Sequence, residues 1–347
     1  MCYFDHILYK RTKKTAFILK IIIPLTVIGY LFLFIFTPRS YIHKKHELIT
    51  IKQGNSLREI TYRLYRKKLI TNPYLFYFIG FISGYSEYIE AGTYYVSASQ
   101  SPVSIYHEFV NGRIASVKVT VPPGLNIFQI AKILAKNRIT GKKLFLKECF
   151  NRKLLLSIGI DERNVEGFLY PNTYIFKIDS NPVKIIKEMV TEFNIKTKNL
   201  KLGYKNLIIA SIITKEANEN SKKNMRLVSS VIHNRLKINM PLDIDSTSIY
   251  ARNLLAYKKY IKTKRNGNFN PALNMNSAYL KIKSPYNTYS NYGLPPTPIA
   301  NPNISAIKAA ANPAKTRYLY YISTKHGKTI FTNNLTEQVK NINKYLK

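Results

Sequence analysis

One glutamate stands out among the residues that could do chemistry, because it ends a long apolar stretch. Residues 207–217 read LIIASIITKEA, which predicts a buried helix. Ile209, Ile212 and Ile213 precede Glu216 by seven, four and three residues, so a helix would place them on its face. A carboxyl group there loses hydration, which raises its pKa and suits it to act as a general acid near neutral pH. The alternative is a glutamate at the helix end whose carboxylate reaches solvent.

Few other acids accompany Glu216 in this part of the chain. From residue 200 to the end the sequence offers only Glu219, Asp243, Asp245 and Glu337 besides it. Hydrolytic glycosidases usually need two carboxyl groups about 5 to 9.5 Å apart. Asp245, which follows a Met-Pro-Leu segment, is the acid best placed to fold back towards Glu216. A mechanism that uses one glutamate therefore has to be considered beside two-carboxylate hydrolysis.

Two loop segments further along the chain carry residues suited to sugar recognition. Residues 286–289 read YNTY, and residues 293–302 read GLPPTPIANP. Tyrosine rings can lie flat on the apolar faces of sugars, and an asparagine amide matches an acetamido group. The prolines predict a stiff, irregular second loop. The alternative is ordinary loop structure in which the tyrosines belong to the core.

The elements that must position these residues begin with a hydrophobic segment near the N-terminus. Residues 21–37 carry no charge, and extension back to Thr15 gives about 23 residues, enough to cross a bilayer core of about 30 Å. Basic residues precede the segment, which favours a cytoplasmic N-terminus, although others follow it. No small-x-small cleavage site follows. We expect an uncleaved anchor over residues 15–37 after a cytoplasmic tail over 1–14; the alternative is a buried core helix.

Beyond this segment, the patterns predict a small mixed module and a larger mixed domain. Residues 47–53 (ELITIKQ) and 91–96 (AGTYYV) indicate strands, with a turn and a helix start at residues 54–56. Residues 117–121 (VKVTV) indicate a further strand. The other expected elements are a helix capped by Asn126, helices over 182–193 and 222–237, a hairpin of 317–323 with 328–332, and a helix from Thr336. This mixture predicts an α+β fold.

Composition narrows the function classes. The chain has 347 residues, of which 46% are hydrophobic, as is typical of a folded protein. Its 54 Lys and Arg outnumber 18 Asp and Glu, but they are scattered, which favours compositional drift over nucleic-acid binding. Two cysteines, Cys2 and Cys149, exclude a disulfide scaffold and a four-cysteine zinc site. The sequence has no His-x-x-x-His pair and no Gly-x-Ser-x-Gly elbow, so we expect no metal, no other cofactor and no serine hydrolase.

Seven pieces of the sequence, taken together, resemble the YceG-like endolytic murein transglycosylases, membrane-anchored enzymes of bacterial cell-wall synthesis. The pieces are AGTYYV (91–96), EGFLYPNTY (166–174), IIASIITKEA (208–217), VSSVIHNRL (228–236), MPLDIDSTSIY (240–250), YNTY (286–289) and GLPPTPIANP (293–302). They occur in the family's order and cover roughly residues 47–345. Each piece alone is a weak signal, whereas seven in order are specific.

The resemblance implies a catalytic glutamate in the piece that ends in Lys-Glu, here Glu216. It also implies a LysM-like module, here residues 47–113, followed by a catalytic domain over 114–347. The protein would cross the inner membrane once, with its catalytic domain on the periplasmic or extracytoplasmic side. Its substrate would be the glycan strands of peptidoglycan. Cell-wall synthases and inner-membrane lipid would be partners, and nucleic acid would not.

The implied reaction cuts the bond between N-acetylmuramic acid and N-acetylglucosamine without water. Glu216 would act first as acid and then as base, and the muramic C6 hydroxyl would close a 1,6-anhydro ring. Asp245, Asn287 and Tyr289 are candidates for holding the substrate or orienting Glu216. Such an enzyme could terminate glycan elongation. The alternative is a catalytically weak, wall-binding scaffold of the synthesis machinery.

The chain departs from the family's pattern at several positions. We expect a glutamate where it has Pro123, an aspartate where it has Asn172, and a proline where it has Ser246. An acidic position before the helix over 222–237 corresponds to Asn224. Several of these changes remove an acid, as compositional drift would, but they leave Glu216 in place.

Overall fold

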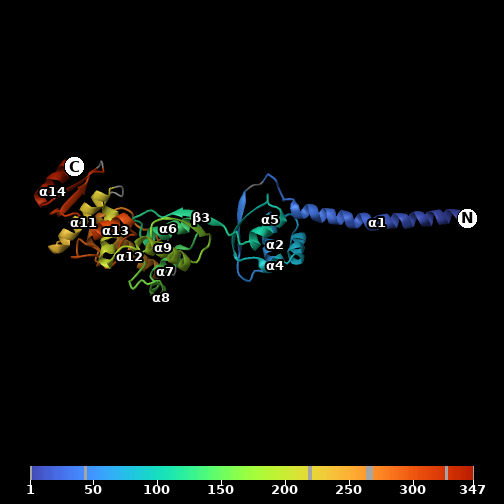
Figure 1. The fold of residues 1–347 in the computed structure, drawn as a ribbon, viewed down its shortest axis with the longest axis horizontal. Helices are drawn as coiled ribbons and strands as arrows, with labels where there is room; N and C mark the ends of the chain where they lie inside the picture. The colour runs from blue at the N-terminus through green and yellow to red at the C-terminus, as the bar shows by residue number, and fades with distance from the viewer. Residues whose placement is uncertain (1, 43–44, 218–220, 263–268, 325–326, 347) are drawn as a thin grey trace. The chain divides into compact units, whose positions relative to one another are not determined.

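The structure, a computed structural model, describes residues 2–42, 45–217, 221–262, 269–324 and 327–346. The chain divides into two compact units, residues 1–116 and residues 117–347. Each unit has its own hydrophobic core, and the elements of both mix helices with short two-stranded sheets (Figure 1). The predicted α+β class is confirmed.

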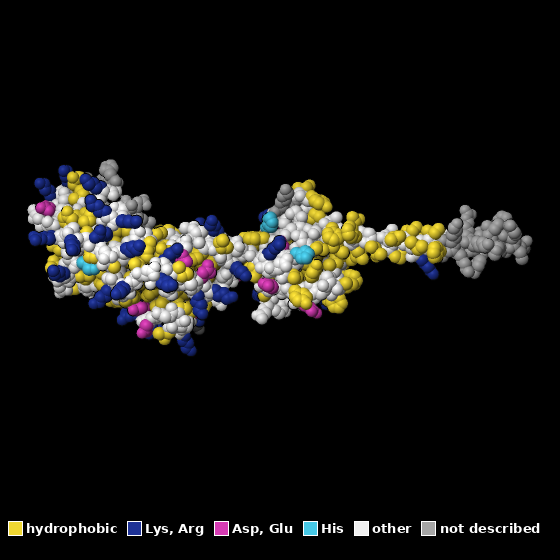
Figure 2. All heavy atoms as spheres, viewed as in Figure 1, with side chains coloured by type: hydrophobic (Ala, Val, Ile, Leu, Met, Phe, Trp, Pro, Cys, Tyr) yellow, Lys and Arg dark blue, Asp and Glu magenta, His cyan; other side chains and the backbone are white. Residues whose placement is uncertain are grey.

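The N-terminal unit begins with one long helix, α1 (Cys2–Phe36). Its segment Phe17–Phe36 is long and apolar enough to cross a membrane, and only 6% of the tested window is buried. On the face that Figure 2 shows, this stretch carries mainly hydrophobic side chains. A core helix would instead be buried, so the finding is compatible with the predicted anchor over 15–37.

A small module follows α1 in the same unit. Strand β1 (His46–Ile51) pairs antiparallel with β2 (Gly92–Ser97), with His46 opposite Ser97. The helices of the module are α2 (Leu57–Arg66), α3 (Pro73–Ile82), α4 (Tyr85–Tyr88) and α5 (Pro102–Val110). The predicted strands and first helix are confirmed, while α3 to α5 were not anticipated. The LysM-like character of the module stays a prediction.

The second unit opens with a two-stranded sheet and four helices. Strand β3 (Ser116–Thr120), predicted over residues 117–121, pairs with β4 (Thr173–Lys177), which was not predicted. Asn126 caps the helix after β3 through a complete capping box with Gln129, as predicted for the cap. The helices are α6 (Ile127–Lys136), α7 (Lys142–Cys149), α8 (Arg152–Ser157) and α9 (Pro182–Thr197).

The remaining elements surround α10 (Tyr204–Glu216), whose residues 207–214 are all buried. Helices α11 (Lys222–Lys237), α12 (Asp245–Lys262) and α13 (Ile304–Ala311) pack against it. The chain continues after α12 through a short 3-10 helix, η1 (Ser277–Lys281), and ends with β5 (Tyr320–Ser323), β6 (Thr329–Thr332) and α14 (Leu335–Tyr345). The predicted hairpin is confirmed, but α12 was not predicted.

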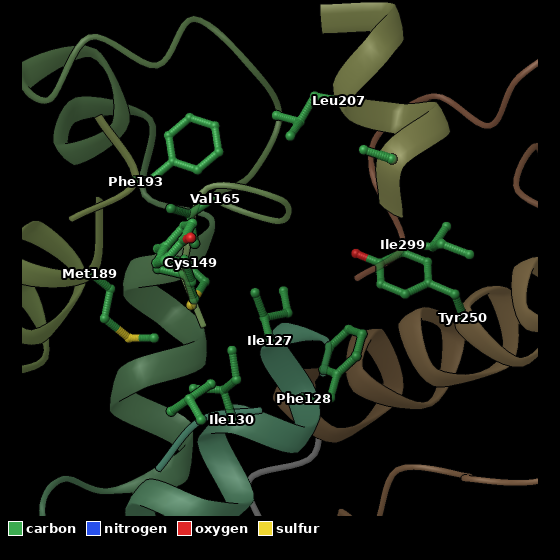
Figure 3. Close-up of a cluster of buried hydrophobic side chains, with 14 of the residues drawn as sticks. Ile127, Phe128, Ile130, Cys149, Val165, Met189, Phe193, Leu207, Tyr250 and Ile299 are labelled. Carbon is green, nitrogen blue, oxygen red and sulfur yellow. The ribbon is translucent and has the colours of Figure 1, made fainter. Parts of the chain in front are cut away.

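The core of the second unit joins elements that are far apart in the sequence. Figure 3 shows Phe128 of α6, Cys149 of α7, Leu207 of α10 and Tyr250 of α12 within one cluster. Cys149 is a free, fully buried cysteine. Because this cluster fixes α10 and α12 relative to each other, it also fixes the ends of both helices, where polar side chains emerge.

Candidate active site

Glu216 is the last residue of α10, at the point where this helix leaves the core. Ile209, Ile212 and Ile213 precede it and are buried, while Glu216 itself is partly exposed. Lys215 beside it is exposed. The helix therefore carries a carboxyl group from an apolar interior to an opening at the surface.

Two hydroxyl groups hold the carboxyl group of Glu216. Ser246 Oγ donates to Glu216 Oε1 over 2.8 Å, and Tyr321 OH donates to Glu216 Oε2 over 3.1 Å. Ser246 lies in the first turn of α12 and Tyr321 lies in β5. Both carboxyl oxygens thus have partners within the protein, and the side chain is not a free helix end that reaches into solvent.

Burial raises the pKa of Glu216 above its ordinary value, and the charge of Asp245 adds to this rise. The hydrogen bonds from Ser246 and Tyr321 and the charge of Lys215 act in the opposite direction but do not cancel the effect of burial. The carbonyl end of a helix also disfavours a negative charge. The raised pKa suits Glu216 to give up a proton to a substrate and to take one back.

Glu216 lies in a pocket of about 190 Å³. The lining residues come from α10, α11, the segment before α12, the YNTY loop and β5: Glu216, Val231, Ile232, Arg235, Leu242, Asp243, Ile244, Asp245, Tyr289 and Tyr321. Tyr289 OH donates to Asp245 Oδ1 over 2.7 Å, and both side chains are exposed. The structure thus brings Glu216, Asp245 and Tyr289 to one opening.

Arg235 braces one wall of this pocket. Its guanidinium group donates to the carbonyl oxygens of Leu319, Pro241 and Leu242 over 2.6 to 3.0 Å. It also lies 3.6 Å from the carboxylate of Asp243. These contacts tie the end of α11 to the residue before β5 and to the segment that leads into α12, so the helix that carries Ser246 starts at a fixed place.

Asn287, the fourth predicted site residue, lies inside the protein with an exposed fraction of 0%. Its side-chain NH₂ donates to the carbonyl oxygens of Leu280 and Ile282, and its side-chain oxygen accepts from Ser248 Oγ. The amide is therefore fully engaged in holding the YNTY loop against α12. This arrangement places Asn287 behind the pocket and away from its lining.

The EGFLYPNTY and GLPPTPIANP pieces of the sequence meet at a buried carboxyl group, that of Glu166. Glu166 is completely buried and accepts hydrogen bonds from Ile127 N and Asn301 Nδ2. Asn301 Oδ1 in turn accepts from the amides of Gly167 and Leu169. These bonds join the GLPPTPIANP loop, the EGFLYP loop and the start of α6.

Gly124 brings the Pro-Pro-Gly turn to the same place. It has a φ of +78°, which favours glycine, and its amide donates to the carbonyl oxygen of Asn301 over 2.9 Å. Lys215 Nζ donates to the carbonyl oxygen of Gly124 over 3.3 Å. The turn therefore contacts the last turn of α10 at Lys215, next to Glu216.

The polar side chains at this opening favour acid–base chemistry. Among the described residues, no three His, Cys, Asp or Glu side chains are grouped so that they could hold a metal ion. Glu219, one of the acids noted in the sequence, lies outside the described residues. The opening is lined by three carboxyl groups, the partly exposed Glu216 and the exposed Asp243 and Asp245, and by the hydroxyl groups of Tyr289 and Tyr321.

Comparison with known proteins decides the family. The profile of the YceG-like family matches residues 49–344. The chain belongs to the YceG-like family. Among curated relatives of this YceG-like chain is the endolytic murein transglycosylase of Bacillus subtilis (strain 168), 31% identical over 322 residues, which cover 86% of the chain and 84% of the relative.

Two further comparisons agree with this family. The endolytic murein transglycosylase of Streptococcus pneumoniae (strain D39) is 26% identical over 335 residues, and the match covers 86% of this YceG-like chain and 58% of that relative. A crystal structure of a YceG-like protein from Listeria monocytogenes is 30% identical, with a TM-score of 0.52. The match covers 86% of this chain and 99% of that structure.

Sequence reasoning missed several residues of the site. Ser246 and Tyr321, the two donors to Glu216, were not assigned, and neither was Arg235. Glu166 was noted only as part of a motif. A serine or tyrosine in a tyrosine-rich chain gives no signal of its own, so only the tertiary contacts distinguish these from their neighbours.

Proposed function

We propose that this YceG-like chain is an endolytic murein transglycosylase with Glu216 as its single acid–base residue. The observation that carries the proposal is the position of Glu216, which ends a buried helix, lines a pocket and accepts hydrogen bonds from Ser246 and Tyr321. The names of the curated relatives supply the substrate class, peptidoglycan glycan strands.

In the proposed reaction, protonated Glu216 gives its proton to the oxygen between N-acetylmuramic acid and N-acetylglucosamine. The bond from muramic C1 to this oxygen breaks, and positive charge develops on the muramic ring. The C6 hydroxyl of the same ring then attacks C1, and its proton passes to the Glu216 carboxylate. One C–O bond is broken and one is formed, the proton lost to the leaving oxygen is replaced by that of the C6 hydroxyl, no water enters, and Glu216 regains its starting state.

The contacts of Glu216 suit both halves of this cycle. After the first proton transfer the residue is a carboxylate, and the hydroxyl donors Ser246 and Tyr321 stabilise that form. Because the attacking hydroxyl is already part of the substrate, no second carboxylate has to activate water. Asp245 and Tyr289, which border the pocket and are exposed, are assigned to holding the sugar. Asn287 is assigned to holding the loop that carries Tyr289.

The proposed anchor gives the enzyme a cellular location, and the proposed position of the cut gives it a role in glycan synthesis. Segment Phe17–Phe36 would hold the protein in the cytoplasmic membrane, with the second unit on the extracytoplasmic side. Cuts within nascent strands close to the membrane would then end their elongation. Each such cut would leave a 1,6-anhydro end, and the enzyme would act as a terminator of glycan strands.

The test is digestion of purified murein by the full chain in detergent, with products weighed by mass spectrometry. We expect anhydro-ended fragments, about 18 mass units lighter per cut than hydrolysis would give. Glu216→Gln should keep the fold and lower the rate by at least about 10²-fold. Glu188→Gln, at another glutamate whose pKa burial raises but which lies on α9, is the matched control. Reducing muramic ends, or an active Glu216→Gln variant, would contradict the proposal.

The second candidate is a wall-binding scaffold without catalysis. It predicts no fragments from the parent protein and equal retention of murein by the parent and by Glu216→Gln. The two hydroxyl donors on Glu216 favour the enzyme, because a scaffold has no need to hold a carboxyl group with a raised pKa inside a pocket.

A further inference from the structure

Helix α3 of the N-terminal unit turns an apolar stripe outward. Tyr74, Tyr77, Phe78, Phe81 and Ile82 are all exposed and follow one another at the spacing of a single helical face. Tyr74 is 84% exposed, and Phe81 and Ile82 are each 67% exposed. We call these five side chains the outer face of α3.

The inner face of the same helix is apolar as well. Phe76 and Gly80 are buried, and the Tyr106 hydroxyl packs so close to Gly80 that no Cβ would fit there. The helix has no charged residue over its whole length. A helix that is apolar on both faces normally packs against a partner on each face. Within the part of the chain that the structure describes, the outer face of α3 stays exposed.

The outer face lies in the unit that also contains the candidate membrane span. Phe34, in the last turn of α1, is buried against the module, and α1 contacts α5. Arg39 Nη1 donates to the carbonyl oxygen of Ile70, three residues before α3 begins. Ser40 N donates to the carbonyl oxygen of Ala98 over 2.9 Å. The module is therefore fastened to α1 where the span ends, and Figure 2 shows hydrophobic side chains on the part of the module that adjoins this helix.

We propose that the outer face of α3 lies in the interface of the lipid bilayer next to the point where α1 leaves it. Aromatic side chains are enriched at this depth, and an apolar helix face there sits about 5–10 Å into the boundary between head groups and acyl chains. Arg39, at the end of the span, suits the head-group level. The proposal rests on the proposed anchor and adds a second contact with lipid.

Lipid fits this surface better than a glycan strand does. A groove of about 790 Å³ runs beside it, and its lining includes Glu59 and Arg58 as well as Tyr74 and Tyr77. Sugars need such polar partners. Phe78, Phe81 and Ile82, however, carry no polar side-chain atom and belong to the outer face without lining the groove. The fully apolar part of α3 has nothing to offer to sugar hydroxyl groups.

The absence of tryptophan from the sequence allows a background-free test. The full chain is reconstituted in phosphatidylcholine and phosphatidylglycerol vesicles as three single-tryptophan variants. Phe81→Trp reports on α3, Ile28→Trp on the middle of the span, and Ile195→Trp on an exposed position of α9 in the other unit. Emission is recorded with lipids brominated near the head group and with lipids brominated near the chain end.

The proposal expects Phe81→Trp to emit at shorter wavelength than Ile195→Trp and to be quenched most by bromine near the head group. Ile28→Trp should be quenched most by bromine near the chain end. If Ile28→Trp is quenched and Phe81→Trp is not, the contact of α3 with lipid is wrong while the anchor stands. If neither is quenched, the anchor itself is wrong. Transglycosylase activity is measured separately and tests neither.

Two alternatives to lipid as the partner of the outer face of α3 predict different results in the same experiment. A change in Phe81→Trp emission that needs chitooligosaccharide, with no quenching by brominated lipid, would show a glycan surface. Short-wavelength Phe81→Trp emission without quenching by brominated lipid, which moves to longer wavelength when the protein is diluted among excess vesicles, would show a contact between two copies of the chain. Either result would overturn the proposal.

Discussion

Removal of the Tyr321 hydroxyl should raise the pKa of Glu216 and move the alkaline limb of the reaction to higher pH. Tyr321 OH donates to Glu216 Oε2 over 3.1 Å, and this bond stabilises the carboxylate form. Burial and the charge of Glu216 raise the pKa of Tyr321 well above its ordinary value, so the hydroxyl stays a donor at any working pH. Tyr321→Phe deletes this one donor and keeps the ring.

The size of the shift follows from the strength of the bond. A hydrogen bond to a charged group contributes about 1.5–3 kcal/mol, and one pKa unit corresponds to about 1.4 kcal/mol. The full range would be about one to two units. Because 3.1 Å is longer than the usual O–H···O distance of about 2.7–2.8 Å, and because Glu216 is partly exposed, we expect a rise of about one unit.

The assay is the pH dependence of kcat/KM for release of anhydro-ended fragments. The general acid must be protonated, so activity falls as pH rises through its pKa, and a higher pKa moves this fall upward. Tyr320→Phe is the matched control. Tyr320 precedes Tyr321 in β5, and its ring, which the substitution keeps, packs against the guanidinium group of Arg235. We expect the control to keep the parent profile and nearly the parent rate.

Two results would refute this reasoning. An alkaline limb that stays in place in Tyr321→Phe would mean that Glu216 is not the group that titrates in the reaction. A limb that moves to lower pH would mean that the hydroxyl stabilises the acid form, contrary to the assigned direction of the hydrogen bond.

Three further predictions concern the support of Glu216. Ser246→Pro should fold, since proline fits the first turn of a helix, and by removing the donor to Glu216 Oε1 it should also shift the alkaline limb of kcat/KM upward. Burial raises the pKa of Glu166 to about 8. The acid form therefore adds stability that is complete below the unfolded pKa near 4.5 and is lost as pH rises towards 8. Glu166→Gln should flatten this fall in the free energy of unfolding, on the order of a few kcal/mol, in urea unfolding of the second unit between pH 5 and 8. Gly167→Ala should lower the urea midpoint strongly, because its φ is +90° and a Cβ would lie 2.6 Å from Pro298 Cγ, whereas Gly159→Ala, with φ +77° and open space, should lower it less.

The fold was predictable where a short-range pattern decides it. The apolar run that ends in Glu216, the cap at Asn126 and the hairpin near the C-terminus each depend on neighbours in sequence, and the structure has all three. Helix α12 was missed because its pattern is weak and its buried residues are largely Ser, Thr, Asn and Tyr. Its stability comes from tertiary hydrogen bonds, such as the one between Thr247 and Thr288, which no local pattern reveals.

The same distinction explains the site residues. Glu216 could be found because a charge on an apolar stripe is unusual within a single helix. Asn287 was chosen for the chemistry of its amide, but that amide is used up by Leu280, Ile282 and Ser248. Whether a polar side chain faces a substrate or its own loop depends on the path of the backbone, so residue type alone could not separate Asn287 from Tyr289.

The positions at which the chain departs from the family's pattern bear on whether acid–base chemistry is retained. Asn172 and Asn224, where acids are expected, donate to Glu192 and Thr329, outside the pocket of Glu216. Ser246, where a proline is expected, is the departure that contacts the carboxyl group of Glu216, and it adds a donor that proline lacks. A donor to the carboxylate lowers the pKa of Glu216, which offsets part of the rise caused by burial. Asn172 and Asn224, where acids are expected, therefore leave the contacts of Glu216 intact, and Ser246 lowers the pKa of Glu216 without cancelling the effect of burial.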